Sequence, residues 1–202
     1  MQWIVLQLSR YLNEPVSRNR WVAVKRVLRY LRGTINYQLT FRSGDAKLVG
    51  YSDSDWAGAS DRKSTSGYCF TLGGTDGANL ISWRSQRQSV VALSTCEAEY
   101  ISLSCAFQEG IYLQNLISDL SGSKLKAVQM YCDNQSAIAW SKNPVNHGRS
   151  KHISVKYHFV REHIDRGFSI AYVPSEKMLA GFLTKSVGKI VLKNATGKIF
   201  IS

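Results

Sequence analysis

Three short runs of β-forming residues, followed at once by a long helical stretch, constrain the fold of this chain more than any other feature. The runs lie at 47–55, 66–74 and 79–85, and loops rich in Gly, Ser and Asp separate them. Short runs bounded by turn residues predict successive strands, here an antiparallel meander. The stretch 94–120 carries apolar residues at helical spacing, with an interruption expected near Gly110.

The rest of the chain alternates between strand and helix. The periodicity predicts a strand at 127–133, a helix at 134–143, a second helix at 154–167, a strand at 168–174 and a last short helix at 176–185. This order is typical of the α/β class, with a mixed five-stranded sheet flanked by helices.

A basic amphipathic segment precedes this α/β unit. Residues 17–33 place apolar side chains three and four positions apart, with Lys and Arg between them and a glycine at the end. This pattern predicts a helix that packs its apolar stripe on a neighbour and leaves a basic face in solvent, which is compatible with phosphate binding.

The charge of the chain indicates a polyanionic partner. The 202 residues include 26 Lys and Arg against 14 Asp and Glu, a formal net charge of +12 at pH 7. Such an excess favours nucleic acid as the partner, and a basic surface that serves solubility alone is the alternative. No apolar run approaches the roughly 20 residues of a membrane-spanning helix, and no secretory signal is recognised, so we expect an intracellular protein without a membrane partner.

Three carboxylates stand where predicted strands end or helices begin. Asp53 lies at the end of the first strand, Glu99 in the first turns of the long helix, and Asp133 after the strand at 127–133. Carboxylates that converge from separate elements are costly unless a cation lies between them, and Mg²⁺ prefers oxygen ligands. The three are therefore candidate catalytic residues and metal ligands.

Each of these positions also has a structural interpretation. Asp53 could be a turn residue or a helix cap. Glu97 follows Ser94 by three residues, the spacing of a capping box, which assigns Glu97 to the helix start and leaves Glu99 for a site. Asp133 could equally cap the helix that follows it.

Four long motifs carry a resemblance to a known family. They are GYSDSDWAG at 50–58, ISWRSQRQSVVALSTCEAEY at 81–100, YCDNQSAIAWSKNPVNHGRSKHISVKYHFVRE at 131–162 and YVPSEKMLAGFLTK at 172–185. In this order they resemble the ribonuclease H domain of Ty1/copia-type retrotransposon Pol polyproteins. Upstream, WVAVKRVLRYLRGT is similar to the segment that connects reverse transcriptase to this domain.

The resemblance implies a division of the chain into three parts. Residues 1–46 would be a remnant of the reverse transcriptase connection segment, residues 47–186 an RNase H-like domain, and residues 187–202 an unassigned tail. Reverse transcriptase would then be a partner supplied in trans, and the protein would lie in a cytoplasmic virus-like particle or in the nucleus.

The resemblance also implies the chemistry of the site. The family cleaves the RNA strand of RNA–DNA hybrids endonucleolytically with four carboxylates and two Mg²⁺ ions, for which Mn²⁺ can substitute. Asp53 corresponds to the ligand that bridges both ions, Glu99 to a ligand of the ion near the leaving group, and Asp133 to a further ligand.

One position departs from the family pattern. The family has an aspartate after the alanine that corresponds to Ala180, whereas this chain has Gly181, which offers no side-chain ligand. Glu176 lies more than one helical turn away, so we do not expect it to substitute. A glycine inside the predicted helix would also cost about 1 kcal/mol. We therefore expect impaired hydrolysis, with a catalytically inactive hybrid-binding remnant of a degraded or domesticated element as the alternative.

Substrate contacts need cations for phosphates and small polar groups for sugar hydroxyls. The candidate substrate-binding residues are Ser54, Arg62, Lys63, Ser64, Asn134 and Gln135. Asn134 and Gln135 are expected near the RNA strand, and a capped helix start is an equally good interpretation of this pair.

Overall fold

The framework of the fold is a mixed five-stranded sheet with the strand order β4-β3-β2-β5-β6. The computed structural model describes residues 18–39, 41–43, 47–58, 61–73, 79–125, 127–142 and 151–201. The strands are β2 (Leu48–Asp55), β3 (Thr65–Leu72), β4 (Leu80–Arg87), β5 (Val128–Cys132) and β6 (Phe168–Tyr172). The first three form an antiparallel meander, while β5 runs parallel to β2, and β6 parallel to β5. The predicted α/β class and mixed sheet are confirmed.

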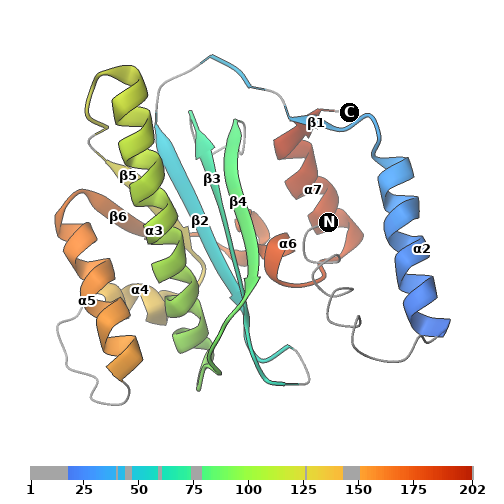
Figure 1. The fold of residues 1–202 in the computed structure, drawn as a ribbon, viewed down its shortest axis with the longest axis horizontal. Coiled ribbons are helices and arrows are strands. Elements are labelled where there is room, and N and C mark those ends of the chain that lie inside the picture. The colour runs from blue at the N-terminus through green and yellow to red at the C-terminus, as the bar shows by residue number, and fades with distance from the viewer. Residues whose placement is uncertain are drawn as a thin grey trace.

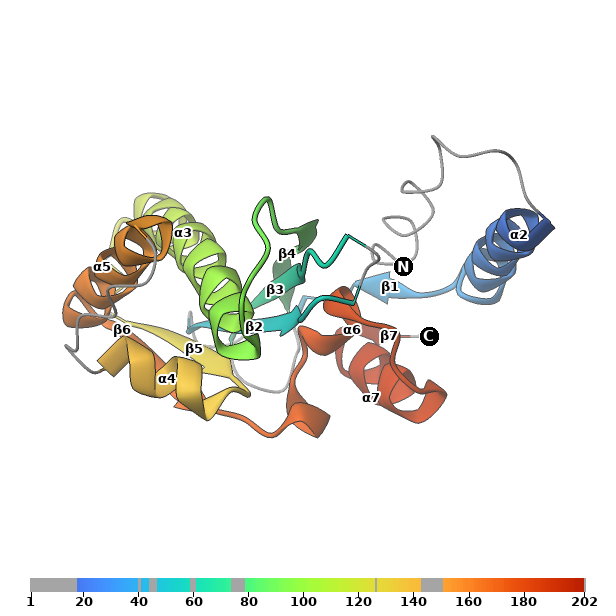
Figure 2. The same ribbon diagram turned by 90° about the horizontal axis from the view of Figure 1, so that it is seen from below.

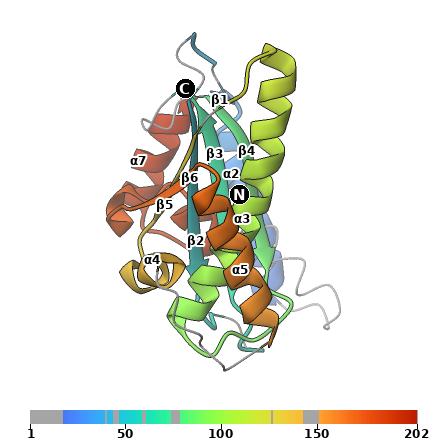
Figure 3. The same cartoon turned by 90° about the vertical axis from the view of Figure 1, so that its left-hand side faces the viewer.

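Two long helices cover one face of the sheet (Figure 3). They are α3 (Thr95–Ser121) and α5 (Lys151–Asp165), and the short α4 (Gln135–Lys142) packs against both near the end of β5. The interruption predicted near Gly110 is wrong, because α3 is continuous. A Cβ at Gly110 would lie 3.0 Å from Phe168 and 3.2 Å from Phe70, so this glycine lets two buried rings pack against the helix.

The opposite face carries a thinner layer that follows β6 (Figure 2). It contains the 3₁₀ helix η1 (Ser175–Lys177), α6 (Gly181–Thr184) and α7 (Lys189–Ile199). The single helix predicted at 176–185 is wrong. Met178, Leu179 and Ala180 lie between η1 and α6 and are all buried, so the segment divides at these three residues.

Gly67 allows this layer to approach the sheet closely. A Cβ at Gly67 would lie 2.6 Å from Cγ2 of Thr184 and 3.0 Å from Cβ of Leu183. Real Cβ atoms do not make contacts of 2.6 Å, so α6 rests on β3 at a distance that only glycine permits.

The flanking segments meet beside the main sheet. The predicted basic helix is present as α2 (Arg18–Gly33), while residues 1–17 lie outside the described part of the chain. β1 (Gln38–Leu39) pairs with β7 (Phe200–Ile201) from the tail, next to α7 (Figure 1). An apolar cavity of about 620 Å³ lies between α2 and the sheet. Among the described residues, no helix is both long and apolar enough to cross a membrane.

Candidate active site

Asp53 lies near the carboxyl end of β2, with its side chain on the face covered by α6. Only 1% of this residue is exposed. Both carboxylate oxygens have partners: the Thr184 hydroxyl donates to Oδ2, and Nζ of Lys185 lies 3.6 Å from Oδ1. The backbone carbonyl of Asp53 accepts a 2.7 Å hydrogen bond from the Ser102 hydroxyl of α3. Elements from both layers therefore hold this residue.

Glu99 reaches the same end of the sheet from α3. Its Oε1 accepts a 3.1 Å hydrogen bond from the backbone N–H of Ser54, whereas Oε2 is buried without a hydrogen-bond partner in the described residues. The capping motif predicted at this helix start is present. Oγ of Ser94 accepts from the N–H of Glu97 at 3.1 Å, and the Glu97 carboxylate accepts from the N–H of Leu93 at 2.9 Å. Glu97 therefore serves the helix start, as expected, and Glu99 faces the site.

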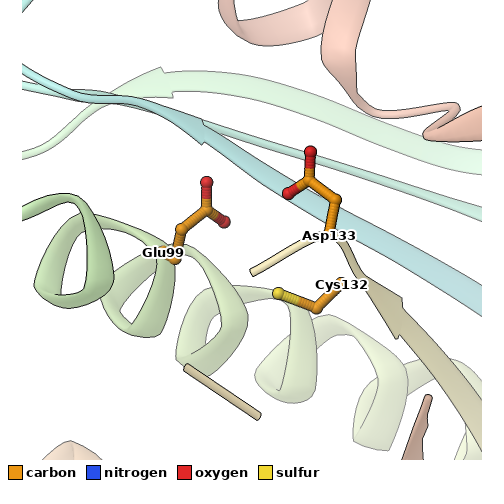
Figure 4. A group of neighbouring side chains, drawn as sticks. All are labelled: Glu99, Cys132 and Asp133. Atoms are coloured by element: carbon orange, nitrogen blue, oxygen red, sulfur yellow. The ribbon is translucent and has the colours of Figure 1, made fainter. Parts of the chain in front are cut away.

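Asp133 directly follows β5 and points into the same space as Glu99, beside Cys132 (Figure 4). One potential ligand atom from each of these three residues lies within 4.8 Å of the other two. Oδ2 of Asp133 accepts a 2.7 Å hydrogen bond from the Ser175 hydroxyl. The cap of α4 is Asn134, whose Oδ1 accepts a 2.9 Å hydrogen bond from a backbone N–H of the first turn. The cap role that the sequence left open for Asp133 thus belongs to Asn134.

Burial and mutual repulsion disfavour negative charge on Asp53 and Glu99. Burial raises the pKa of Asp53 to about 6, against the opposing effects of the Lys185 ammonium and the Thr184 hydroxyl. The pKa of Glu99 is raised well above its ordinary value, first by burial and then by the charges of Asp53 and Asp133. A cation among the three carboxylates would relieve both effects.

The donor set fits a hard divalent ion. It offers carboxylates from β2, from α3 and from the end of β5, including Oε2 of Glu99, which has no hydrogen-bond partner in the part of the chain that the structure describes. Mg²⁺ takes such oxygen ligands in preference to sulfur. Burial, followed by the charge of Glu99, raises the pKa of the Cys132 thiol, so this sulfur stays protonated at neutral pH and competes poorly as a ligand.

Gly181 lines the same small hollow as Asp53, Asp133 and Lys185. A Cβ built at Gly181 would meet no atom of the described structure within 4 Å, so there is room for a side chain. Because Gly181 is the first residue of α6, the cost expected for an interior helical glycine does not apply. Glu176 is exposed in η1 and is absent from the described lining of this hollow.

The predicted substrate-binding residues differ in exposure. Ser64 is fully buried, and its Oγ accepts from the N–H of Ala57 at 3.3 Å. Arg62 is exposed and Lys63 half-buried in the loop between β2 and β3, at the end of the sheet that carries Asp53. Gln135 is exposed at the start of α4. Their substrate roles, like that of Ser54, stay predictions.

The sequence did not reveal the hydrogen-bonding partners of the carboxylates. Thr184 and Lys185 belong to the last family-like motif, but that motif implied no contact with Asp53. Nothing in the sequence marks Ser102 or Ser175, since serines are common and these two reach the site only through the fold.

The order and direction of the strands and the helices that flank them define a fold of the ribonuclease H class. The N-terminal RNase H domain of rv2228c from Mycobacterium tuberculosis, solved as a fusion with maltose-binding protein, superposes with a TM-score of 0.52 at 13% identity, covering 76% of this chain and 98% of that one. LC11-RNase H1, solved in complex with an RNA/DNA hybrid, gives a TM-score of 0.51 at 18% identity, covering 68% of this chain and 94% of that one. At these identities the likeness shows the fold alone.

Sequence relatives identify the family. The retrovirus-related Pol polyprotein from transposon TNT 1-94 of Nicotiana tabacum is 46% identical over 182 residues, 89% of this chain. That from transposon RE2 of Arabidopsis thaliana is 37% identical over 202 residues, 98% of this chain. The chain spans 13% and 14% of these polyproteins, and no protein-family model matches it. It belongs to the copia-type retrotransposon Pol polyproteins and corresponds to their RNase H domain.

Proposed function

We propose that this chain is a metal-dependent ribonuclease H that cleaves the RNA strand of RNA–DNA hybrids, with hydrolysis impaired by Gly181. The observation that carries the proposal is the cluster of Glu99 and Asp133, in which a buried Glu99 oxygen has no hydrogen-bond partner among the described residues. Asp53 lies outside this cluster of ligand atoms, but it lines the same hollow as Asp133 and is near enough for its charge to raise the pKa of Glu99. Buried carboxylates of like charge are costly to maintain without a cation. Membership of the copia-type family supports the same conclusion.

The residues of the chain would hold and orient the metal ligands. Asp53, Glu99 and Asp133 would bind the ions, while the Ser54 N–H orients Glu99 and the Ser175 hydroxyl orients Asp133. Two bound Mg²⁺ ions, or Mn²⁺ in their place, supply an activated water and charge stabilisation at the departing oxygen. With a glycine at position 181, one side of this ligand set would be incomplete.

We propose that the hybrid lies across the end of the sheet that carries the three carboxylates. Arg62 and Lys63 would contact phosphates, and Asn134 and Gln135 would lie near the RNA strand. LC11-RNase H1 was solved with an RNA/DNA hybrid, and the charge of +12 fits such a polyanion.

The same proposal includes the division into 1–46, 47–186 and 187–202, with reverse transcriptase acting in trans. The pairing of β1 with β7 is compatible with this division and brings the connection segment and the tail together beside the nuclease domain.

Gly181 favours one second candidate, a hybrid-binding remnant without turnover. Loss of a carboxylate removes a metal ligand but leaves the basic loop with the exposed Arg62 and the half-buried Lys63 in place. Binding and cleavage therefore need separate measurements.

The test is cleavage of an RNA–DNA hybrid labelled on the RNA strand, by the chain and by three variants. We expect Mg²⁺-dependent cleavage by the chain, faster cleavage by Gly181→Asp, no gain from Gly181→Ala, and none by Asp53→Asn. If only Gly181→Asp cleaves, the second candidate replaces the first. If no variant cleaves a hybrid that all of them bind, the nuclease proposal is wrong.

A further inference from the structure

The element that lacks the fourth carboxylate supplies two other groups to the site. α6 begins at Gly181 and ends at Thr184, whose hydroxyl donates to Oδ2 of Asp53. The next residue, Lys185, places its ammonium 3.6 Å from Oδ1, and its N–H bonds to the Gly181 carbonyl at 3.3 Å. One turn of chain therefore covers both oxygens of Asp53.

The Lys185 ammonium neutralises a buried charge. Asp53 is 1% exposed, and a carboxylate at such a depth is stable as an anion only with a cation or several donors beside it. The side chain of Lys185 is 46% exposed, so its flexible stem can carry the ammonium into solvent without unfolding α6. The ion pair between Lys185 and Asp53 therefore stabilises the buried carboxylate, and it can also break while α6 stays folded.

We infer that Lys185 is the counter-ion of Asp53 in the metal-free chain, and that its ammonium competes with a divalent ion for Oδ1 of Asp53. The inference rests on the proposed function, because it concerns the same carboxylates. Lys185 acts through Asp53: a divalent ion that binds Oδ1 must first displace the Lys185 ammonium from this carboxylate. Gly181 makes this competition stronger, because position 181 has no carboxylate whose negative charge would compensate for the ammonium and attract the divalent ion.

The first test measures Mn²⁺ binding to the full chain by calorimetry, at fixed ionic strength and without nucleic acid. We expect Lys185→Met to bind Mn²⁺ roughly tenfold more tightly, because the variant removes the positive charge that lies 3.6 Å from Oδ1 of Asp53. Lys177→Met is the matched control, since this exposed lysine of η1 makes the same change in net charge. Its effect should stay below about twofold through screening.

The second test needs no variant. Acetylation of Lys185 by acetic anhydride, followed by peptide mass spectrometry, reports the freedom of its ammonium. Saturating Mg²⁺ should raise the labelling rate of Lys185 several-fold and leave that of Lys177 unchanged.

The outcomes separate this inference from the proposed function. Equal affinities of Lys185→Met and Lys177→Met, or labelling of Lys185 that Mg²⁺ leaves unchanged, would overturn the competition while leaving a metal site in place. If neither the parent chain nor Gly181→Asp binds Mn²⁺, the proposed function fails first, and the competition with it.

Discussion

The contact between Gly67 and α6 yields a prediction with a built-in control. A Cβ at Gly67 would lie 2.6 Å from Cγ2 of Thr184, 3.0 Å from Cβ of Leu183 and 3.2 Å from the Ala180 carbonyl. Thr184 cannot rotate away freely, because its hydroxyl is bonded to Asp53. Gly67→Ala therefore has to push α6 off β3, and such overpacking costs about 1–3 kcal/mol.

Gly181→Ala is the control, because it also adds one methyl group, but at the first residue of α6 and away from the contact with β3. Its Cβ would meet nothing within 4 Å in the described structure, and the φ of Gly181 is not positive. An alanine in unstrained backbone stabilises a protein by about 0.4–1 kcal/mol, because it restricts the unfolded chain. The free energies of unfolding of the two variants should thus differ by about 1.4–4 kcal/mol.

Urea unfolding followed by far-ultraviolet circular dichroism measures this difference. We expect a lower midpoint for Gly67→Ala and an equal or higher midpoint for Gly181→Ala, with similar slopes. A Gly67→Ala chain as stable as Gly181→Ala would refute the close approach of α6 to the sheet.

Three further predictions concern Asp53, Ser94 and Ser102. Without divalent ions, stability should fall as pH rises from about 4 to about 6, because the raised pKa of Asp53 makes the folded chain bind more protons than the unfolded one. Asp53→Asn should reduce this slope in urea titrations with chelator, and an unchanged slope would contradict the burial of this charge. Ser94→Ala should cost about 1 kcal/mol by removing the cap of α3, measurable as a lower melting temperature, and no change would rule out the cap. Ser102→Ala should cost about 1–3 kcal/mol in the same assay, because the Asp53 carbonyl loses a buried donor; the control Ser104→Ala, which removes a bond within α3, should cost less.

Local pattern was sufficient to predict the strands of the meander. The runs that became β2, β3 and β4 are short and bounded by turn residues, and β2 and β3 lie almost entirely in the core. Prediction failed where tertiary packing outweighs local preference. Gly110 reads as a helix breaker yet lies against Phe70 and Phe168, and 176–185 reads as one helix yet divides so that Met178 and Leu179 are buried.

The sequence indicated the carboxylates of the candidate site but not the residues that hold them. Asp53, Glu99 and Asp133 stand at element ends, and family-like motifs surround them. Their partners depend on register between distant segments: Thr184 lies 131 positions from Asp53, and Ser175 lies 42 positions from Asp133. No local pattern encodes such pairs, because the order of strands and the placement of α6 decide them.

Because of the open space beside Gly181, selection for a stable fold and selection for activity make different demands on this position. Cellular quality control acts on chains that spend time unfolded, and its signal is lost stability. The backbone of Gly181 is unstrained, and a Cβ there would meet no atom of the described structure within 4 Å, so the fold itself places little constraint on which residue stands at this position. Under the proposed function, selection for stable folding alone would therefore not act on this position, and a carboxylate could be introduced there by one residue change that meets no steric obstacle.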